Sequence, residues 1–267
     1  MNSLSTRAKE LLESKTVDVV IGYESGPTGI VRPAFVTDPS NTEKLIYDEQ
    51  CVQNLAVYLT KPEVKKLGRM AITASLPVMR SIMMLLSEQQ VVAEDIVVLG
   101  ISADGKLLDI PDITVMQGFI EKSELGNPPK DKELLVELNK LSSGERFKWW
   151  QNEFSRCIKC YACRQACPMC YCTRCAVEVN QPQWIPVQSN IQGNMEWHIL
   201  RAMHLAGRCI SCGECGRACP VGIPCHLLTM HLADQTLKYF NMHAGTSDKM
   251  KSVLSVYEPG DKENFII

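Results

Sequence analysis

Cysteine is the residue type that sets this sequence apart, and most of its cysteines stand in one pattern that occurs twice. The first copy reads Cys157-x-x-Cys160-x-x-Cys163-x-x-x-Cys167-Pro168, and the second reads Cys209-x-x-Cys212-x-x-Cys215-x-x-x-Cys219-Pro220. Two-residue spacers let three thiolates converge from one tight loop, and the Cys-Pro pair supplies a fourth where the chain turns away. This spacing is typical of cubane iron–sulfur proteins, so the two copies predict two 4Fe–4S clusters.

The fourth cysteine of each copy is expected to bind the cluster of the other copy, as it does in two-cluster ferredoxins. The predicted ligands are Cys157, Cys160, Cys163 and Cys219 for cluster 1, and Cys209, Cys212, Cys215 and Cys167 for cluster 2. This exchange would lock the two copies together and hold the clusters close enough for electron exchange. No Asp or Glu occurs in residues 154–177, which contain several Arg and Lys residues. Such an acid-free, basic setting favours an anionic cluster.

Zinc is the alternative metal, because C-x-x-C pairs often bind it. Zinc sites usually contain two separated cysteine pairs, without a third cysteine two residues further on and without a Cys-Pro pair. Here the complete spacing recurs in both copies. Iron–sulfur clusters are therefore favoured over zinc for the eight motif cysteines.

Five cysteines lie outside the two motifs. Three of them directly follow the first motif: Cys170, Cys172 and Cys175. They form either a third metal site, with Cys225 or Cys51 as its fourth ligand, or buried thiols that pack against cluster 1. Cys51 by itself is expected to be a core thiol within a helix predicted for residues 50–60. His198 and His204 lie on the helix predicted before the second motif, where they either tune a cluster or are structural.

The remaining composition is that of a globular protein. Of the 267 residues 45% are hydrophobic and 22% charged, and the formal net charge of −2 gives no reason to expect a nucleic-acid partner. Twelve of the 13 cysteines fall between Cys157 and Cys225, which favours metal binding over a distributed disulfide framework. The first ten residues do not resemble a signal peptide, and the most apolar stretch, 70–86, contains Pro77 and Arg80. We therefore expect a cytoplasmic protein without direct membrane insertion.

The first half of the chain has the pattern of an α/β domain. A helix is expected at 5–14, strands at 17–23, 29–37 and 44–47, and a helix at 50–60. Gly22, Gly26 and Gly29 match no phosphate-binding loop and predict a hairpin turn. A strand at 69–75, a helix at 78–90 and a strand at 95–102 predict a β-α-β unit with parallel strands.

The second half is expected to be mainly helical, with helices at 131–141, 145–156, 194–207 and 226–240. We place the domain boundary at Ser142-Ser143-Gly144, which gives an α/β partner-docking domain at 1–143 and a helical dicluster ferredoxin domain at 144–267. The fold class is thus α+β. An aromatic stripe of Phe147, Trp150 and Phe154 is expected to form a wall beside the first cluster.

The motif regions carry a resemblance to a known group. At RCIKCYACRQACPMCYC (156–172) and RAMHLAGRCISCGECGRACP (201–220) the chain resembles the dicluster iron–sulfur β subunits that accompany heterodisulfide reductase-like, formate dehydrogenase and hydrogenase complexes of anaerobes. The second motif and its trailing helix are also similar to the helical ferredoxin part of heterodisulfide reductase. The N-terminal half resembles, more weakly, the β subunits of deazaflavin-reducing hydrogenases and dehydrogenases, through residues 51–59 and 69–102.

This resemblance implies an electron-transfer subunit that is not itself catalytic and that relays electrons through two 4Fe–4S clusters within a larger anaerobic oxidoreductase complex. The implied partners are heterodisulfide reductase-like, formate dehydrogenase or hydrogenase modules. The alternative is a β subunit whose N-terminal domain itself reduces a flavin or deazaflavin coenzyme. Relatives carry cysteines where this chain has Leu76-Pro77-Val78 and where it continues after Ser102, so no flavin and no N-terminal cluster are assigned.

Overall fold

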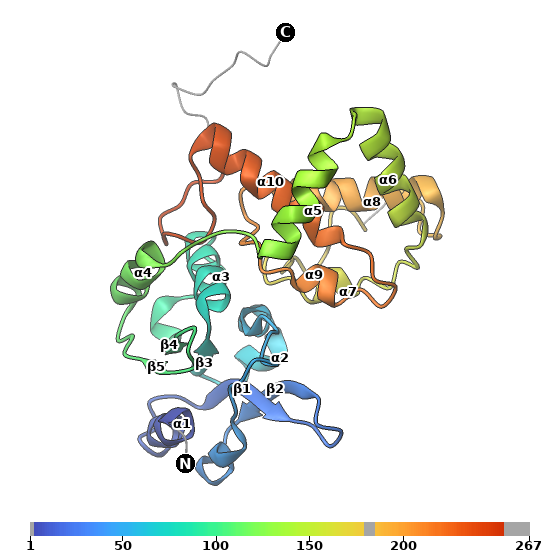
Figure 1. Ribbon diagram of the computed structural model, residues 1–267. Coiled ribbons are helices and arrows are strands. Elements are labelled where there is room, and N and C mark those ends of the chain that lie inside the picture. The colour runs from blue at the N-terminus through green and yellow to red at the C-terminus, as the bar shows by residue number, and fades with distance from the viewer. Residues whose placement is uncertain (1–2, 179–184, 254–267) are drawn as a thin grey trace. The chain divides into compact units, whose positions relative to one another are not determined.

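The computed structural model describes residues 3–178 and 185–253, which form two compact units. Of these residues, the first unit contains 3–124, 167–171 and 245–249, and the second contains the others. The first unit is α/β and the second is mainly helical, which confirms the predicted fold class (Figure 1). The first unit gives way to the second after Glu124. The sequence places this change at residue 143, and the assignment of 1–143 as a domain stays a prediction.

The first unit is built on a mixed five-stranded sheet with strand order β2-β1-β3-β4-β5. The strands are β1 (Val19–Ser25), β2 (Val31–Val36), β3 (Met70–Ala74), β4 (Ile96–Ile101) and β5 (Leu107–Leu108). β3 pairs in parallel with both β1 and β4, whereas β2 and β5 are antiparallel edge strands. The amide of Gly26 donates to the carbonyl of Ile30 at 2.9 Å and closes the β1–β2 turn. The predicted hairpin and the predicted β-α-β unit are both confirmed.

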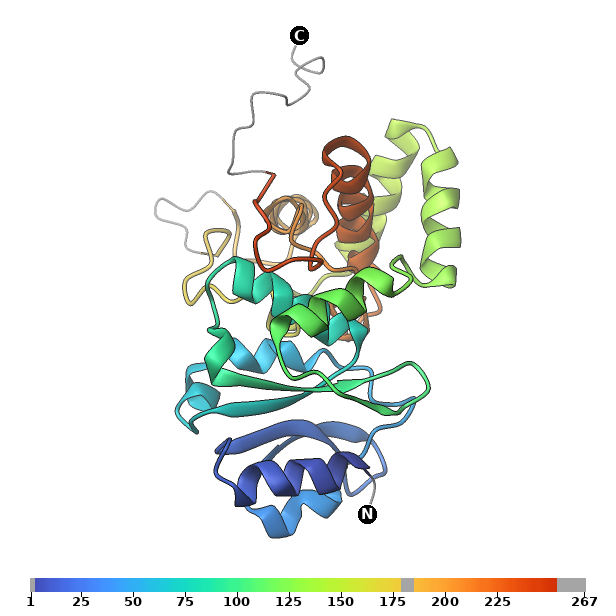
Figure 2. The same cartoon turned by 90° about the vertical axis from the view of Figure 1, so that its left-hand side faces the viewer.

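Helices cover both faces of this sheet (Figure 2). α1 (Ser3–Glu13) and the 3₁₀ helix η1 (Pro39–Lys44) lie on one face, and α3 (Leu76–Ser87) and α4 (Ile113–Lys122) lie on the other. All five residues of β3 are buried, because this central parallel strand has an apolar layer on each side. On the α1 side, Leu4 and Leu11 belong to one apolar cluster with residues of β1, β3 and β4.

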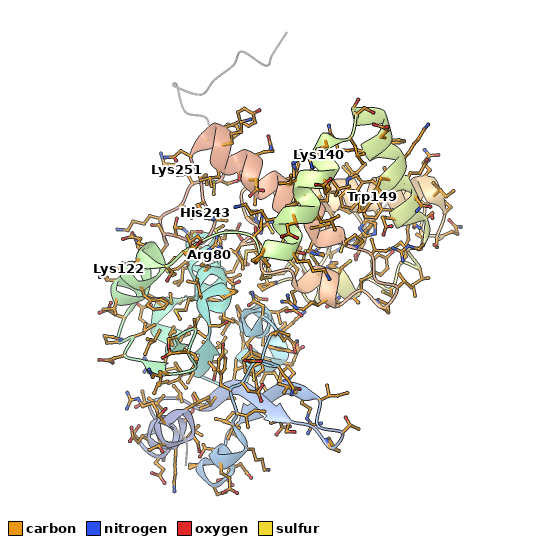
Figure 3. The ribbon with its side chains drawn as sticks, in the orientation of Figure 1. Arg80, Lys122, Lys140, Trp149, His243 and Lys251 are labelled. Carbon is orange, nitrogen blue, oxygen red and sulfur yellow. The ribbon has the colours of Figure 1, made fainter. Side chains whose placement is uncertain are left out.

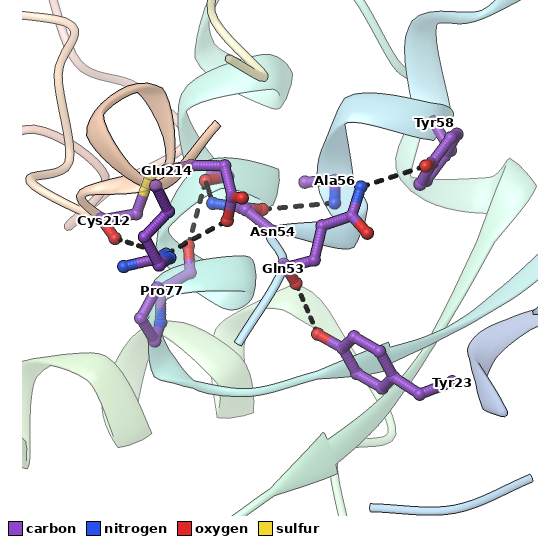
Figure 4. A network of polar contacts seen from close by, with 10 residues as sticks. Tyr23, Gln53, Asn54, Ala56, Tyr58, Pro77, Cys212 and Glu214 are labelled. Carbon is purple, nitrogen blue, oxygen red and sulfur yellow. Dashed lines mark hydrogen bonds and ion pairs between the residues drawn. The ribbon is translucent and has the colours of Figure 1, made fainter. Parts of the chain in front are cut away.

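Two local predictions between residues 39 and 60 are wrong. η1 and a single bridge from Tyr23 to Ile46 replace the strand predicted at 44–47. The helix predicted at 50–60 is reduced to the 3₁₀ helix η2 (Leu55–Thr60), which is followed by the one-turn α2 (Pro62–Lys65). The buried Asn54 explains this late start, because its Oδ1 accepts from the amide of Ala56 and its Nδ2 donates to Ser81 Oγ (Figure 4). Asn54 is thus the N-cap of η2 and sets the residue at which the helix begins.

The described part of the second unit is assembled from four longer helices and two single turns of helix. They are α5 (Pro129–Lys140), α6 (Ser143–Ser155), α7 (Ala162–Gln165), α8 (Ile191–His204), α9 (Glu214–Arg217) and α10 (Cys225–Phe240). Ser142 begins α6 with a capping box, in which its hydroxyl accepts from the amide of Glu145 and its own amide donates to the Glu145 carboxylate. In the described parts of the chain, no helix combines the length and apolar composition needed to cross a membrane.

Cys51 lies in the loop before η2 and is 6% exposed. The amide of Asp48 donates to its sulfur at 3.3 Å, and the thiol lies 3.6 Å from the Asp48 carboxylate. Burial, with a smaller contribution from the Asp48 charge, raises the pKa of Cys51 to about 11. The side chain is therefore a protonated core thiol at neutral pH, although it does not lie in the predicted helix.

We expect iodoacetamide to alkylate Cys51 about 100-fold or more slowly in the native protein than in the urea-unfolded chain at pH 8, because only the thiolate reacts and an unperturbed thiol titrates near 8.5. Peptide mass spectrometry of the Cys51 peptide measures both rates. The unfolded thiol loses its proton first, so the stability that Cys51 contributes is present below about pH 8.5 and is lost as the pH rises toward 11. Equal alkylation rates of Cys51 in the native and the unfolded chain would contradict the assignment of Cys51 as a buried, protonated thiol.

Candidate metal centre

The two cysteine motifs share one backbone conformation. The second residue after the first cysteine is left-handed in both copies, with φ of 51° at Lys159 and 61° at Ser211. The residue after the second cysteine is also left-handed, with φ of 58° at Tyr161 and 74° at Gly213, and each begins a single turn of helix, α7 or α9. Alternation of right- and left-handed residues turns successive amides toward one concave side, which suits an anion.

Backbone amides donate to cysteine sulfur in both motifs. The amide of Lys159 lies 3.4 Å from Cys157 Sγ, and that of Ser211 lies 3.4 Å from Cys209 Sγ. The amide of Ile223 adds a third such bond, at 3.3 Å from Cys219 Sγ. Hydrogen bonds of this kind stabilise thiolates and are among the groups that set the potentials of iron–sulfur clusters. The donors present therefore fit a cluster with thiolate ligands.

One cavity contains the whole ligand set predicted for cluster 1. It is lined by Cys157, Cys160, Cys163 and Cys219, together with apolar side chains such as Ile158, Val221 and Ile223. Cys219 belongs to the second motif, yet it lines the same cavity as the three cysteines of the first. Burial and the neighbouring thiols raise the pKa of Cys157. This arrangement fits the predicted exchange, while the binding of iron by these residues stays a prediction.

Cys209 and Cys215 of the second motif lie near a buried cation. Arg201 of α8 is 5% exposed and donates from Nη2 to the carbonyl of Cys163 at 2.9 Å. A hydrogen bond from Cys225 and the positive charge of Arg201 lower the pKa of Cys215 despite its burial. Arg201 thus interacts with both motifs. Cys167, the predicted fourth ligand of cluster 2, belongs to the first unit, and its role stays a prediction.

Two further contacts hold the loop of the second motif. Arg217 donates to the carbonyl of Cys212 at 2.8 Å and forms an ion pair with Glu214 at 3.0 Å (Figure 4). The ring of His226 fills the space beside Gly216, where a Cβ atom would lie only 2.0 Å from His226 Nδ1. Gly216 is therefore required for the close packing of α10 against this loop.

The α8 helix presents a polar face to the first motif that the sequence pattern left unassigned. Four buried residues at helical spacing make up this face: Asn194, Trp197, His198 and Arg201. Asn194 Nδ2 donates to the carbonyls of Phe154 and Cys157 at 3.0 and 2.9 Å. Trp197 and His198 line the cavity of the first motif. The sequence left His198 open between a structural and a tuning role. The available signal was the i, i+3, i+4 and i+7 spacing of these four residues, which places them on one side of a helix.

The predicted aromatic wall is only partly present. Phe154 is fully buried and packs in the same apolar cluster as Cys163, with Trp150 stacked on it at 5.0 Å between ring centroids. The ring of His198 stacks on that of Phe154, with 4.1 Å between the ring centroids and an angle of 3° between the ring planes. Phe147 is 54% exposed, so its inclusion in the wall is wrong. Burial, and then the charge of Arg201, lower the pKa of His198 to about 3, which makes its imidazole neutral at ordinary pH.

The three cysteines after the first motif have different surroundings. Cys170 and Cys175 are half-buried, whereas Cys172 is exposed and its carbonyl accepts from Arg164 at 2.8 Å. Cys225, one proposed fourth ligand, is buried and donates to the carbonyl of Cys215. Over residues 3–178 and 185–253, no three His, Cys, Asp or Glu side chains come close enough together to hold a single metal ion. A third metal site stays a prediction.

Comparison with known protein families covers this same segment. Residues 156–224 match a 4Fe-4S dicluster domain. The match confirms the predicted 4Fe–4S cluster domain and begins one residue before Cys157. The domain contains both motifs and the connecting α8, while the number of clusters and their individual ligands stay predictions.

Two curated relatives are similar to part of the chain. It is 40% identical over 76 residues to the F420-dependent formate dehydrogenase subunit beta of Methanocaldococcus jannaschii, which covers 28% of this chain and 19% of that relative. It is 39% identical over 54 residues to the F420-dependent formate dehydrogenase 1 subunit beta of Methanococcus maripaludis, which covers 16% of this chain and 14% of that relative. The chain therefore spans less than a fifth of the length of these relatives.

We expect Arg201→Leu to retain less than half of the wild-type iron after anaerobic reconstitution, because it removes a buried cation that bonds to one motif and lies beside a thiolate of the other. Hydrogen bonds to charged groups contribute about 1.5–3 kcal/mol, so the free energy of unfolding should fall by about this amount. Iron per chain and denaturant unfolding measure the two effects.

Arg208→Leu is the matched control, because Arg208 lies just beyond the end of α8 and one residue before Cys209, and donates to the carbonyl of His204. Arg201→Lys, which keeps the charge, should recover part of the iron. Wild-type iron content in Arg201→Leu would show that this cation is not needed.

Proposed function

We propose that this chain is an electron-transfer subunit that relays single electrons through two 4Fe–4S clusters within a larger oxidoreductase complex. The observation that carries the proposal is the match of residues 156–224 to a 4Fe-4S dicluster domain, in which four cysteines from both motifs line one cavity. The relatives named above are subunits of formate dehydrogenases, which supports a role as one part of an assembly.

The proposed ligand sets follow the exchange between the motifs. Cluster 1 takes the four motif cysteines of the shared cavity, and cluster 2 takes Cys209, Cys212, Cys215 and Cys167. When bound, a 4Fe–4S cluster supplies one-electron redox chemistry. The protein supplies thiolates, amide donors at the sulfurs of Cys157 and Cys209, and the positive charge of Arg201. These groups stabilise the negative charge that increases on reduction.

The proposed partners are the other subunits of a formate dehydrogenase, hydrogenase or heterodisulfide reductase-like complex. A second candidate function is suggested by the names of the relatives, both of which are F420-dependent. In that case the N-terminal α/β unit would reduce a flavin or deazaflavin coenzyme with electrons delivered by the clusters. Thermal unfolding with and without the coenzyme separates the two candidates, because only the second expects the coenzyme to stabilise the first unit.

The relay predicts about eight irons per chain after anaerobic reconstitution, since each cubane holds four. Low-temperature EPR of the dithionite-reduced protein should show two interacting paramagnetic clusters. Colorimetric iron and sulfide determination with EPR spin counting measures both. An iron content of about four or less per chain would refute the two-cluster relay.

The exchange of fourth ligands predicts which substitutions share a phenotype. Cys219→Ala and Cys160→Ala should each abolish the EPR signal of cluster 1, while Cys167→Ala and Cys212→Ala should each abolish that of cluster 2. Cys172→Ala is the matched control, because Cys172 is an exposed cysteine outside both motifs. If Cys219→Ala instead matches Cys212→Ala, each motif binds its own cluster and the exchange is wrong.

A further inference from the structure

The cavity of the first motif is lined by two residues that each carry a buried nitrogen atom without a partner among the described residues. Trp197 and His198, on adjacent positions of α8, are 3% and 4% exposed and line this cavity with the four motif cysteines and Cys225. Within residues 3–178 and 185–253, neither Trp197 Nε1 nor His198 Nε2 has a hydrogen-bond partner. Buried polar groups are normally paired, and an unpaired donor in the interior carries its full desolvation cost. The two groups therefore require an acceptor, and the cavity that both residues line can hold one.

Packing holds both rings in place. The ring of His198 lies parallel to that of Phe154, with 4.1 Å between the ring centroids. The ring of Trp197 packs edge-on against the ring of His198, with 4.9 Å between the centroids. Tyr161 stands at a left-handed position of the first motif, and its ring centroid lies 5.4 Å from that of Trp197. Asn194, one turn earlier on α8, is bonded to the carbonyl of Cys157. The two nitrogens are thus fixed relative to the motif loop and do not depend on a mobile side chain.

The chemistry of the two groups indicates which acceptor they fit. An indole N–H is only a donor, and a neutral imidazole carries one N–H, which lies on Nε2 in one of its tautomers. The other lining residues are five cysteines, Lys159, Tyr161 and three apolar residues, so sulfur is the most frequent side-chain acceptor around the cavity. Hydrogen bonds to the sulfurs of a cluster favour its reduced form, because reduction increases the negative charge on sulfur.

We propose that Trp197 Nε1–H and His198 Nε2–H donate hydrogen bonds to sulfur atoms of cluster 1 and thereby raise the reduction potential of that cluster selectively. The inference rests on the proposed function, since it requires a cluster in this cavity. Both residues act through hydrogen bonds to the cluster and are tuning residues, not ligands. The second motif has a contact of its own, in which Arg217 donates to the carbonyl of Cys212.

The test is an EPR-monitored redox titration of the reconstituted chain and of ring-preserving variants. Trp197→Phe and His198→Phe each remove the N–H and keep an aromatic ring in the stack. Each should shift the one-electron equilibrium of cluster 1 about tenfold toward the oxidised form, which corresponds to about 59 mV, and leave cluster 2 unchanged. His198→Gln, which restores a donor, should shift it less than His198→Phe.

Matched controls lie outside the cavity. Trp149→Phe removes an indole from α6 (Figure 3), and His204→Phe removes an exposed imidazole from the last turn of α8. Neither should change the potential of either cluster. Electron–nuclear double resonance of the reduced wild type should detect exchangeable protons coupled to cluster 1, and each cavity variant should lose one of them.

The outcomes separate this inference from the proposed function. A wild-type chain without 4Fe–4S clusters would refute the function itself. A wild-type chain with both clusters, whose potentials and proton couplings are the same in Trp197→Phe and His198→Phe, would refute only the hydrogen-bond inference. Equal shifts of both clusters would also refute it, because no predicted ligand of cluster 2 lines this cavity.

Discussion

Buried negative charge has to be stabilised by hydrogen-bond donors of the protein. In the second unit the single helix α8 contributes several of these donors. The buried polar face of α8 places an amide side chain, an indole, an imidazole and a guanidinium against the cysteine motifs. Asn194 and Arg201, at either end of this face, bond to carbonyls of the first motif. The helix and the motif loop therefore have to fold together, because each satisfies polar groups of the other.

The same constraint explains why strained backbone is tolerated in the motif loops. Lys159, Tyr161 and Ser211 are left-handed without being glycine, a conformation that costs roughly 1–2 kcal/mol per residue. This conformation orients the backbone amides of the loops, and two of these amides donate to cysteine sulfur at 3.4 Å. The stretch from 186 to 189 supports the first loop, since Lys159 bonds to the carbonyl of Pro186 and Ser189 to that of Cys157.

Regular patterns in the sequence were sufficient for much of this structure. The apolar runs at 69–75 and 95–102 predict β3 and β4 because parallel central strands are apolar on both faces, and motif spacing alone predicts that Cys219 joins the cysteines of the first motif. Predictions failed where one side chain decides the outcome. Asn54 sets the start of η2, because its side chain accepts from the amide of Ala56, and Phe147 near the start of α6 is 54% exposed. The helix α4 was missed because its ten residues bury only Met116 and Ile120, which leaves a weak apolar pattern.

The shared backbone of the two motif loops has a consequence for a relay. Two clusters bound in loops with the same backbone and the same surrounding side chains would have the same reduction potential. Here the left-handed position after the second cysteine carries the phenol ring of Tyr161 in one loop and no side chain at Gly213 in the other. The duplication thus preserves the left-handed backbone positions, while the side chains at them make the two loops chemically different.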